Sequence, residues 1–554
     1  MTLDQLPTGP AGETAKAFGA YYTDPAVARF VVGWALRSAS DTVADPAFGG
    51  GVFLAAASER LQQLGGSPSQ IFGVELDAEV HEHTARALAA HFSVCQEHLF
   101  RGDFFELEPT DLRLDAVVGN PPFIRFQRFS GQARERAARR AAEQGVRLGR
   151  LASSWAAFVV HSAAFLRPGG RLGLVVPAEL GHAAYARPLL AYLCRAFERV
   201  RLLSFREKLF PALSQDVLIL LAEGLQAEPR EQNGVFELLD LGGTSDLQTL
   251  ELPWTRARRL DGQALAAGCE HLQGYLLPPH THGLYRHLAC AKETFRLGEV
   301  ARVGTGYVTG HNAFFHLSPA RAQGIPARFL KPSVWAAQAL RGISFTEVDW
   351  DEARQRGQAG FLLHIEAGAA LPPALQAYLE QGQHRGIHQA YKCRVRTPWY
   401  AIPQVQRPDA FLTYMSGEGP RLVVNEAGAV APNSLHLVRT GSGLQARALA
   451  VLWQTSLARL SAELEGHPMG GGMLKLEPGE AERVLLPRLE AEKLAPLADE
   501  LKVLMQKGRL REAQSLADQR VLREGLGLSE KEVAALRDGA DYLRLRRQRR
   551  LAGL

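Results

Sequence analysis

The stretch VVGNPPFIRF, residues 117–126, joins an apolar run to a turn that contains two consecutive prolines. The apolar run, within LDAVVGN (114–120), is typical of a strand buried on both faces. The prolines fix φ and remove two amide donors, so carbonyl oxygens remain there as acceptors. An amide side chain, Asn120, precedes the turn and an aromatic ring, Phe123, follows the prolines. We expect a rigid, acceptor-rich turn at the end of a buried strand.

Short apolar runs alternate with helical patterns on both sides of this turn. The further predicted elements are, in order, a strand in 41–48, a helix in 52–64, a strand in 70–76, a helix in 77–92, a helix in 155–166 stopped by PGG (168–170), and strands in 171–177 and 216–224. Strands separated by helices of this length pair in parallel through crossovers. The pattern predicts an α/β fold with a doubly wound, mostly parallel sheet that ends near residue 225.

The length of 554 residues is too great for one hydrophobic core and predicts two or three domains. From about residue 230 the regular alternation gives way to mixed short strands, turns and helices, and the last sixty residues are helical and highly charged. We therefore expect a first domain over 1–228, an α+β domain over 229–490 and a helical segment over 491–554.

Composition narrows the class of protein. Hydrophobic residues make up 46% of the chain and charged residues 22%, which is ordinary for a soluble globular protein. No run of 18 apolar residues and no signal peptide are present, so no membrane association is expected. The five cysteines are far apart and form no CxxC pair, which fits a reducing cytosol and predicts no metal site.

The net charge of +5 is a mild excess that is compatible with nucleic acid. Two segments concentrate it: residues 125–150 hold eight arginines against two glutamates, and the tail YLRLRRQRR (542–550) is also basic. Each has two interpretations, a nucleic-acid contact or an ordinary solvated helix face.

A glycine-rich turn follows the first predicted strand, in ADPAFGGGVFL (44–54). Glycine lets the backbone approach a ligand closely and adopt positive φ. The turn has neither the GxGxxG spacing of a dinucleotide site nor the lysine of a phosphate loop. Phosphate is therefore not the expected ligand.

Acidic residues near other strand ends suggest what that ligand is. Glu75 ends the second strand, where a carboxylate can accept hydrogen bonds from a ribose diol. Asp103, with Phe104 beside it, precedes the strand of the proline turn and can bond and cover a purine ring. An adenosyl ligand without phosphates fits this order, and S-adenosylmethionine is the common example.

The Asn-Pro-Pro turn then has a chemical interpretation. The side-chain oxygen of Asn120 and the carbonyl of Pro121 can both accept hydrogen bonds from one –NH2 group, which directs the nitrogen lone pair toward a methyl donor. A sulfonium is already a strong electrophile, so orientation and electrostatics suffice without a strong base. Phe123 offers a face for the ring that carries the amine.

These motifs resemble the gamma-class DNA amino-methyltransferases of restriction–modification systems, in which NPP and an aromatic form the catalytic signature. The segment GAYYTDP (19–25) resembles the family motif that precedes the glycine loop. The resemblance covers about residues 15–225 and implies a Rossmann-like methyltransferase domain. It implies catalytic roles for Asn120, Pro121, Pro122 and Phe123, cofactor contacts by Tyr22, Thr23, Asp45, Ala47, Gly49, Glu75, Asp103, Phe104 and Phe158, and target-base stacking by Phe210 and Phe123.

The implied activity is methyl transfer from S-adenosylmethionine to the N6 amine of an adenine in double-stranded DNA. Because a stacked base cannot present its amine to the turn, the base must be extruded, and stacking on Phe123 and Phe210 offsets the cost. The same geometry serves the N4 amine of cytosine. A methyltransferase for RNA, protein or small-molecule amines, and an inactive DNA-binding protein, are further alternatives.

The second half resembles target-recognition domains of type IIG enzymes in segments 304–315, 391–403, 423–439 and 466–478. Candidate DNA contacts are Arg125 and Arg128 after the proline turn and Arg394 and Arg396 in the second half. Only about 18 residues precede GAYYT, too few for a nuclease domain. We expect a bacterial, nucleoid-associated cytoplasmic enzyme that acts alone or as the modification partner of a separate restriction endonuclease.

Overall fold

The computed structural model describes residues 23–110, 112–210, 216–228, 234–250, 254, 256–441 and 445–549. These residues form two compact units, of which the first ends at Leu276 and the second spans Leu277–Gln548. None of the helices in the described part of the chain combines the length and the hydropathy of a membrane-spanning segment.

The first unit is built on a nine-stranded sheet with the order β3-β2-β1-β4-β5-β7-β6-β8-β9. Its strands are β1 (Val43–Asp45), β2 (Ile71–Glu75), β3 (Leu99–Arg101), β4 (Leu114–Gly119), β5 (Leu166–Pro177), β6 (Phe197–Phe205), β7 (Val217–Leu225), β8 (Val235–Leu241) and β9 (Arg258–Leu260). The first five strands of this order, β3, β2, β1, β4 and β5, pair in parallel, whereas β7 runs antiparallel to both of its neighbours. The predicted doubly wound, mostly parallel sheet is confirmed.

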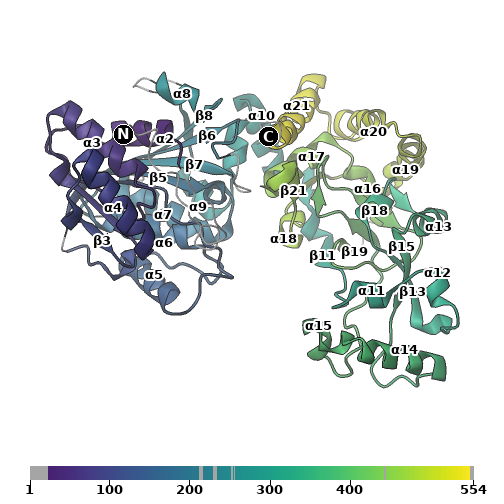
Figure 1. Cartoon of the computed structure of the whole chain (residues 1–554). Helices are drawn as coiled ribbons and strands as arrows, with labels where there is room; N and C mark the ends of the chain where they lie inside the picture. Colours follow the sequence, from purple (N-terminus) through teal and green to yellow (C-terminus); the bar gives the residue numbers. More distant parts are fainter. Residues whose placement is uncertain are drawn as a thin grey trace. The chain divides into compact units, whose positions relative to one another are not determined.

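Helices lie on both sides of this sheet, with α2 and α6 on opposite sides in Figure 1. The helices are α2 (Pro25–Ala35), α3 (Val52–Leu64), α4 (Ala78–Phe92), α5 (Gly131–Glu143), α6 (Ser154–Ala164), α7 (Arg187–Ala196), α8 (Ser245–Gln248) and α9 (Gly262–Ala267). Their buried apolar faces join the sheet in one hydrophobic core. Burial of these faces against the sheet, at about 25 cal/mol per Å² of apolar surface, is the main force that holds the elements together.

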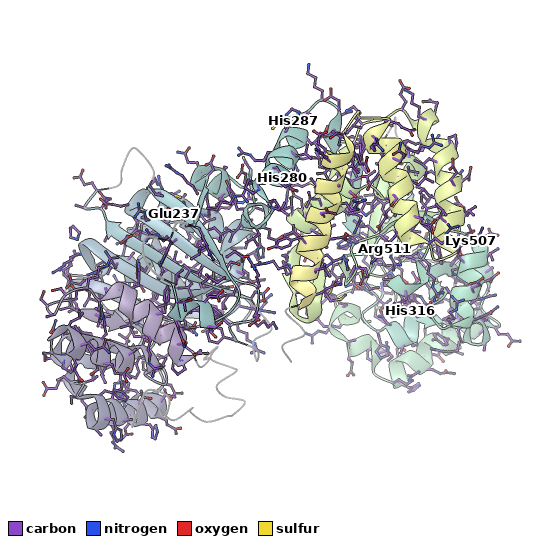
Figure 2. The ribbon with its side chains drawn as sticks, turned by 90° about the horizontal axis from the view of Figure 1, so that it is seen from above. Glu237, His280, His287, His316, Lys507 and Arg511 are labelled. Atoms are coloured by element: carbon purple, nitrogen blue, oxygen red, sulfur yellow. The ribbon has the colours of Figure 1, made fainter. Side chains whose placement is uncertain are left out.

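The sheet differs from the sequence-based expectation in β5, which begins earlier than predicted, and in β3, β6, β8 and β9, which were not predicted. The segment PGG (168–170), expected only to end a helix, lies inside β5, where the pairing with β4 shifts register. Strand β6 was not expected because it carries arginines. Its Arg201 is only 9% exposed and forms ion pairs of 2.9 Å with Glu223 on β7 and with Glu237 on β8. Glu237 is labelled in Figure 2. These cross-strand pairs allow charged residues inside a sheet.

The first unit also extends beyond residue 228, where the sequence places the end of the catalytic domain. Strands β8 and β9 join the same sheet, β8 in parallel with β6 and β9 antiparallel to β8. The compact unit therefore ends 48 residues later, at Leu276. Half-buried and buried residues mostly alternate in β8, which lies next to the edge strand β9 of that sheet.

The second unit is a mixed α+β structure, as expected. Its largest sheet has the order β11-β19-β16-β18-β14, and smaller sheets are formed by β12-β15-β13, β17-β21-β20 and β10-β22. The strands are β10 (Thr294–Arg296), β11 (Ala301–Thr305), β12 (His316–Leu317), β13 (Leu330–Val334), β14 (Ser344–Phe345), β15 (Ala359–Leu363), β16 (Ala410–Leu412), β17 (Met415–Ser416), β18 (Leu422–Asn425), β19 (His436–Thr440), β20 (His467–Met469), β21 (Met473–Lys475) and β22 (Leu485–Pro487).

The helices of the second unit include the predicted C-terminal helical segment. They are α10 (Pro279–Cys290), α11 (Asn312–Phe315), α12 (Pro319–Ala322), α13 (Glu347–Gln355), α14 (Pro373–His384), α15 (Tyr391–Arg394), α16 (Ala446–Leu452), α17 (Ser456–Glu465), α18 (Pro478–Ala481), α19 (Ala491–Gln506), α20 (Leu510–Ala517) and α21 (Glu530–Arg549). Helix α19 packs on α16, so the helical segment forms part of this unit.

Candidate active site

The strand order brings the chemistry-bearing residues of the first unit to one edge of its sheet. Asp45 ends β1, Glu75 ends β2 and Gly119 ends β4. These strands are parallel, so their carboxyl ends meet at the edge where open α/β sheets bind ligands.

The glycine loop between β1 and α3 is tied to the end of β2. Gly49 donates its N–H to Oε2 of Glu75 at 3.0 Å, and its carbonyl accepts from the hydroxyl of Thr84 at 2.9 Å. Gly51 is the N-cap of α3 and has φ 77°, and a Cβ there would lie 2.8 Å from Cγ2 of Thr84. Positive φ and lack of space both require glycine at position 51. The loop is thus held with Gly49 beside the carboxylate of Glu75.

Two carboxyl groups share a poorly solvated environment at this edge. Asp45 is 1% exposed and accepts a hydrogen bond from the N–H of Ala47 at 3.0 Å. Burial, assisted by the nearby charge of Glu75, raises the pKa of Asp45 to about 8. Burial also raises the pKa of Glu75, against the opposing effect of the N–H groups of Asp77 and Gly49. Such a pair favours a ligand that brings positive charge or hydrogen-bond donors.

Gly119 connects this acid pair to the proline turn. A Cβ on Gly119 would lie 2.6 Å from Oδ1 of Asp45, and its φ of 154° is one that other residues rarely adopt. The strand that leads into the turn therefore packs directly on the buried carboxyl group, which leaves no room for a side chain.

The proline turn itself lies at the same edge. Asn120 donates from Nδ2 to the hydroxyl of Thr23 at 3.2 Å, which orients the amide. Thr23 is 8% exposed and Phe123 is also 8% exposed. The structure thus joins Asn120 to the GAYYTDP segment, whose Tyr22 lies outside the described residues. The aromatic residue of the turn is mostly covered by protein.

Asp103 and Phe104 form the next part of the edge, after β3. Oδ1 of Asp103 accepts from the N–H of Phe105 at 3.0 Å and Oδ2 accepts from Arg136 at 2.8 Å. The ring of Phe104 stacks on Phe158 of α6, with centroids 5.5 Å apart and 20° between planes. Phe104 and Phe158 are both buried, so they pack on each other as a wall rather than as two separate exposed faces.

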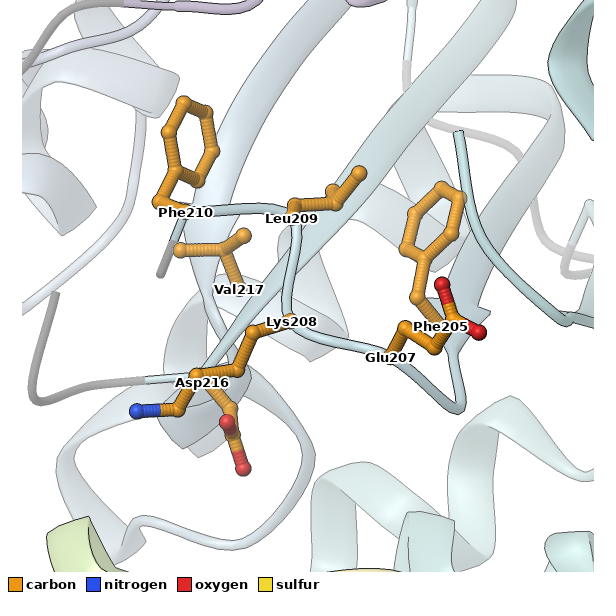
Figure 3. A pocket seen from close by; sticks show the side chains of 7 residues that line it. All are labelled: Phe205, Glu207, Lys208, Leu209, Phe210, Asp216 and Val217. Carbon is orange, nitrogen blue, oxygen red and sulfur yellow. The ribbon is translucent and has the colours of Figure 1, made fainter. Parts of the chain in front are cut away.

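Phe210 lies in the segment between β6 and β7. It lines a small pocket with Phe205, Glu207, Lys208, Leu209, Asp216 and Val217, shown in Figure 3. Val217 pairs with Pro177 at the carboxyl end of β5, so this pocket is at the same edge as the proline turn. Phe210 thus lies at the edge that carries the proline turn, and its role in base stacking stays a prediction.

Two residues at this edge were not found from the sequence. Leu76 directly follows Glu75 and is 61% exposed, which is unusual for a large apolar side chain. Its position after the acid at a strand end is the signal that could have indicated it. Ser154, at the start of α6, accepts a hydrogen bond from the N–H of Ile124 at 2.9 Å. No local sequence pattern indicates that long-range contact.

The four arginines predicted to contact DNA differ in their surroundings. Arg125 and Arg128 are exposed in the segment after the proline turn, and Arg394 is exposed on α15. Arg396, in contrast, donates to the carbonyl of Thr309 at 2.8 Å and to that of Val308, and burial lowers its pKa. Its guanidinium therefore holds a loop of the second unit, which makes Arg394 the better candidate for a DNA contact.

Comparison with protein families agrees with this geometry. Residues 8–185 match the model of the N-6 DNA methylase family, and residues 270–522 match that of the type II methyltransferase M.Eco57I, C-terminal domain. Over residues 8–185 the chain is thus similar to N-6 DNA methylases. The first match contains the glycine loop, the acids and the proline turn of the methylase, and the second lies almost entirely within its second unit.

Relatives of similar length align over most of the methylase. It is 23% identical over 506 residues to the type II methyltransferase M.XamI of Xanthomonas campestris pv. amaranthicola, with 87% of each chain covered. It is 26% identical over 494 residues to M.PaeR7I of Pseudomonas aeruginosa, with 80% of each chain covered. The fold is also similar to that of the type IIL restriction-modification enzyme MmeI in complex with DNA, at a TM-score of 0.52 and 12% identity, covering 96% of this chain and 75% of that one.

Enzymes of this family use S-adenosylmethionine, and the residues of the methylase fit that cofactor. A Cβ on Gly49 would meet only the carbonyl of Ala47, at 4.0 Å, so the loop is open at this position. The carboxyl group of Glu75 lies beside that opening, and the apolar Leu76 is exposed next to it. An open backbone, a carboxylate and an apolar surface suit a nucleoside, and the buried Asp45 suits a sulfonium and an amino group.

Proposed function

We propose that this methylase transfers a methyl group from S-adenosylmethionine to the N6 amine of an adenine that is turned out of double-stranded DNA. The observation that supports the proposal is the direct packing of Gly119 on the buried Asp45, next to the acceptor turn. Methyl donor and amine acceptor would meet at this junction.

We assign the cofactor contacts from the described geometry. Glu75 would accept from the ribose hydroxyls, Leu76 would cover one face of the purine, and Asp103 would accept from its amine. Asp45, together with Thr23, would face the amino-acid end. When bound, S-adenosylmethionine supplies a methyl group on a sulfonium, which needs no further activation.

The turn would hold the target amine by two acceptors. The bond from Asn120 to Thr23 occupies the nitrogen of the amide and orients the side chain. Its oxygen and the carbonyl of Pro121 would accept the two N–H bonds of the amine, which aims the nitrogen lone pair at the methyl group. Catalysis would then come from orientation, to which well-placed groups contribute several kcal/mol, about 7–11 at most.

The extruded base needs contacts that replace its stacking in the duplex. Phe123 and Phe210 lie at the same edge and would supply them, at roughly 1–3 kcal/mol per stacked base. Extrusion costs a few kcal/mol, so two aromatic contacts are of the right size to offset it. Exposed Arg125 and Arg128 would bind the adjacent phosphates.

We further propose that the second unit recognises the DNA sequence. Its exposed helix α15 carries Tyr391, which is 65% exposed, with the cations of Lys392 and Arg394 over its ring at 5.5 and 5.4 Å. Residues 381–408 contain five arginines and lysines and no acidic residue. Such a surface is suited to the phosphate backbone. The role that follows is protection of DNA from a separate restriction endonuclease.

Nucleoside analysis tests the proposed reaction. The purified chain and S-adenosylmethionine are incubated with amplified, and hence unmethylated, bacterial genomic DNA, which is then digested to nucleosides for mass spectrometry. We expect N6-methyladenine with the parent and far less, or none, with Asn120→Ala. N4-methylcytosine would instead support the cytosine alternative, and the absence of any methylated nucleoside would contradict DNA methylation.

A further inference from the structure

The proline turn lacks backbone donors that could stabilise it from within. Pro121 and Pro122 have no N–H, so two of the donors that usually close a turn are absent. A turn whose acceptors must keep one orientation then needs donors and acceptors from another element. In the first unit this element is the start of α6.

Ser154 binds the turn on both sides of Phe123. Its hydroxyl donates to the carbonyl of Pro122 and accepts from the N–H of Ile124 at 2.9 Å. Its own N–H donates to the carbonyl of Ile124 at 3.1 Å. A hydroxyl has one donor and two acceptor sites, so this one side chain can serve both backbone groups at once. Ser154 is fully buried, which strengthens both bonds because water does not compete for them.

The start of α6 also holds other parts of the edge. Trp155 donates from its indole N–H to the hydroxyl of Tyr185 at 3.0 Å, and Tyr185 donates to the carboxylate of Glu179, just after β5. One turn further on, Phe158 stacks on Phe104. The turn is therefore braced by the same helix that supports the loop after β5 and the aromatic wall.

We propose that Ser154 is a positioning residue for methyl transfer, which fixes the backbone around Phe123 and so the orientation of the acceptor groups of the turn. The proposal rests on the proposed function of the turn. Ser154 does not touch the cofactor or the amine in this role. It acts through the turn, so its loss would slow the transfer step and leave cofactor binding intact. Displacement of a reacting group by about 1 Å can cost roughly 10²-fold in rate.

Three variants of Ser154 and one matched control separate this role from a general structural one. Ser154→Ala removes the hydroxyl, Ser154→Cys nearly keeps the volume with a weak donor, and Ser154→Thr keeps the hydroxyl. The control is Ser162→Ala on the same helix. Ser162 is also fully buried, but its hydroxyl has no hydrogen-bond partner among the residues that the structure describes.

The test measures the single-turnover rate with enzyme in excess over amplified genomic DNA, the Kd for S-adenosylmethionine, and the thermal midpoint. We expect Ser154→Ala and Ser154→Cys to slow transfer roughly 10- to 100-fold, with the cofactor Kd within about 2-fold of the parent. Ser154→Thr should be faster than both, and Ser162→Ala should match the parent. If Ser154→Ala does not fold, the cysteine and threonine variants give the same comparison.

Two results would overturn the positioning role. One is transfer at the parental rate by the alanine or cysteine variant. The other is a rate loss accompanied by an equal loss of cofactor affinity, which would indicate general damage to the site. Failure of the proposed function is distinct, because in that case the parent protein itself would not methylate DNA.

Discussion

The carboxyl edge of the sheet in the first unit and helix α15 in the second present polar groups in opposite ways. At the edge, Asp45 is almost completely buried, and Asn120 has its orientation set by a hydrogen bond within the protein. On α15, Lys392 and Arg394 are exposed and rest on the ring of Tyr391. The first arrangement suits chemistry on one fixed group, and the second suits a charged partner that arrives from solvent.

Not every basic segment resembles α15. Arg140, in the arginine-rich segment after the proline turn, is 4% exposed and pairs with Glu108 at 2.6 Å. In the basic tail, Arg547 is also 4% exposed and binds both carboxylate oxygens of Glu463, at 2.9 and 2.8 Å. These arginines stabilise their own units. Basic residues can thus form a binding surface only where they do not pair with carboxylates of their own unit.

The largest effect should come from Asn120→Ala, which tests the carboxyl edge of the sheet, where polar groups are held in fixed positions. Loss of the amide removes one of two proposed acceptors for the amine, and we expect methyl transfer to fall by about 10²–10³-fold or more. The cofactor Kd, measured by calorimetry, should stay within about 2-fold. Transfer at a normal rate would remove the proposed amine clamp.

The next effect should come from Gly119→Ala. The new Cβ would lie 2.6 Å from Oδ1 of Asp45, so the strand or the carboxyl group must move, at a cost of about 1–3 kcal/mol. We expect a lower thermal midpoint and roughly 10-fold weaker cofactor binding. Gly149→Ala is the matched control, since a Cβ there meets nothing within 4 Å. Equal behaviour of the two variants would show that Asp45 and the turn are not coupled.

Much of this edge could be predicted from the sequence, because topology alone places the ends of parallel strands together. Asp45, Glu75 and Asn120 follow apolar runs, and their convergence needs no knowledge of side-chain packing. Ser154 could not be found this way, since its contacts with the turn join residues 30 and 32 positions apart. The hydrogen bond from Arg396 to the carbonyl of Thr309 also joins residues that are distant in the sequence. Strand β6 was not predicted because the carboxylates that neutralise its arginine charge lie on the neighbouring strands.

A smaller effect, on DNA affinity, should come from the double variant Lys392→Ala/Arg394→Ala. If both cations bind phosphates, the slope of log Kd against log salt should become shallower by roughly 1.8, at about 0.9 per contact. Binding to amplified genomic DNA is measured across a range of salt concentrations. Arg356→Ala serves as control, because that exposed arginine pairs with Glu352 at 3.1 Å. An unchanged slope would place the DNA elsewhere.

The last effect concerns stability and pH, through Asp45→Asn without cofactor. The pKa of Asp45 is about 8 in the folded protein and 3.8 as its ordinary value. The folded state therefore holds a proton that the unfolded chain releases, and the resulting stability is full below about pH 4 and is lost as pH rises through 8. Asparagine keeps the acceptor for Ala47 and has no such loss.

The thermal midpoint of Asp45→Asn, relative to the parent, should thus rise between pH 5 and pH 9, by roughly 2–4 °C for each kcal/mol involved. Thermal unfolding of both proteins at a series of pH values measures this difference. A difference that stays constant over the range would mean that Asp45 is ionised in the folded protein throughout.

The central claim is that the Asn-Pro-Pro turn holds the amine of an extruded adenine. Its most direct test is a structure of the protein with a non-reactive cofactor analogue and duplex DNA that contains the methylated site, once that site is mapped by sequencing. We expect the adenine outside the helix, with its N6 about 2.9–3.0 Å from both the side-chain oxygen of Asn120 and the carbonyl of Pro121. An adenine stacked in the duplex, or an amine bound by other groups, would contradict the claim.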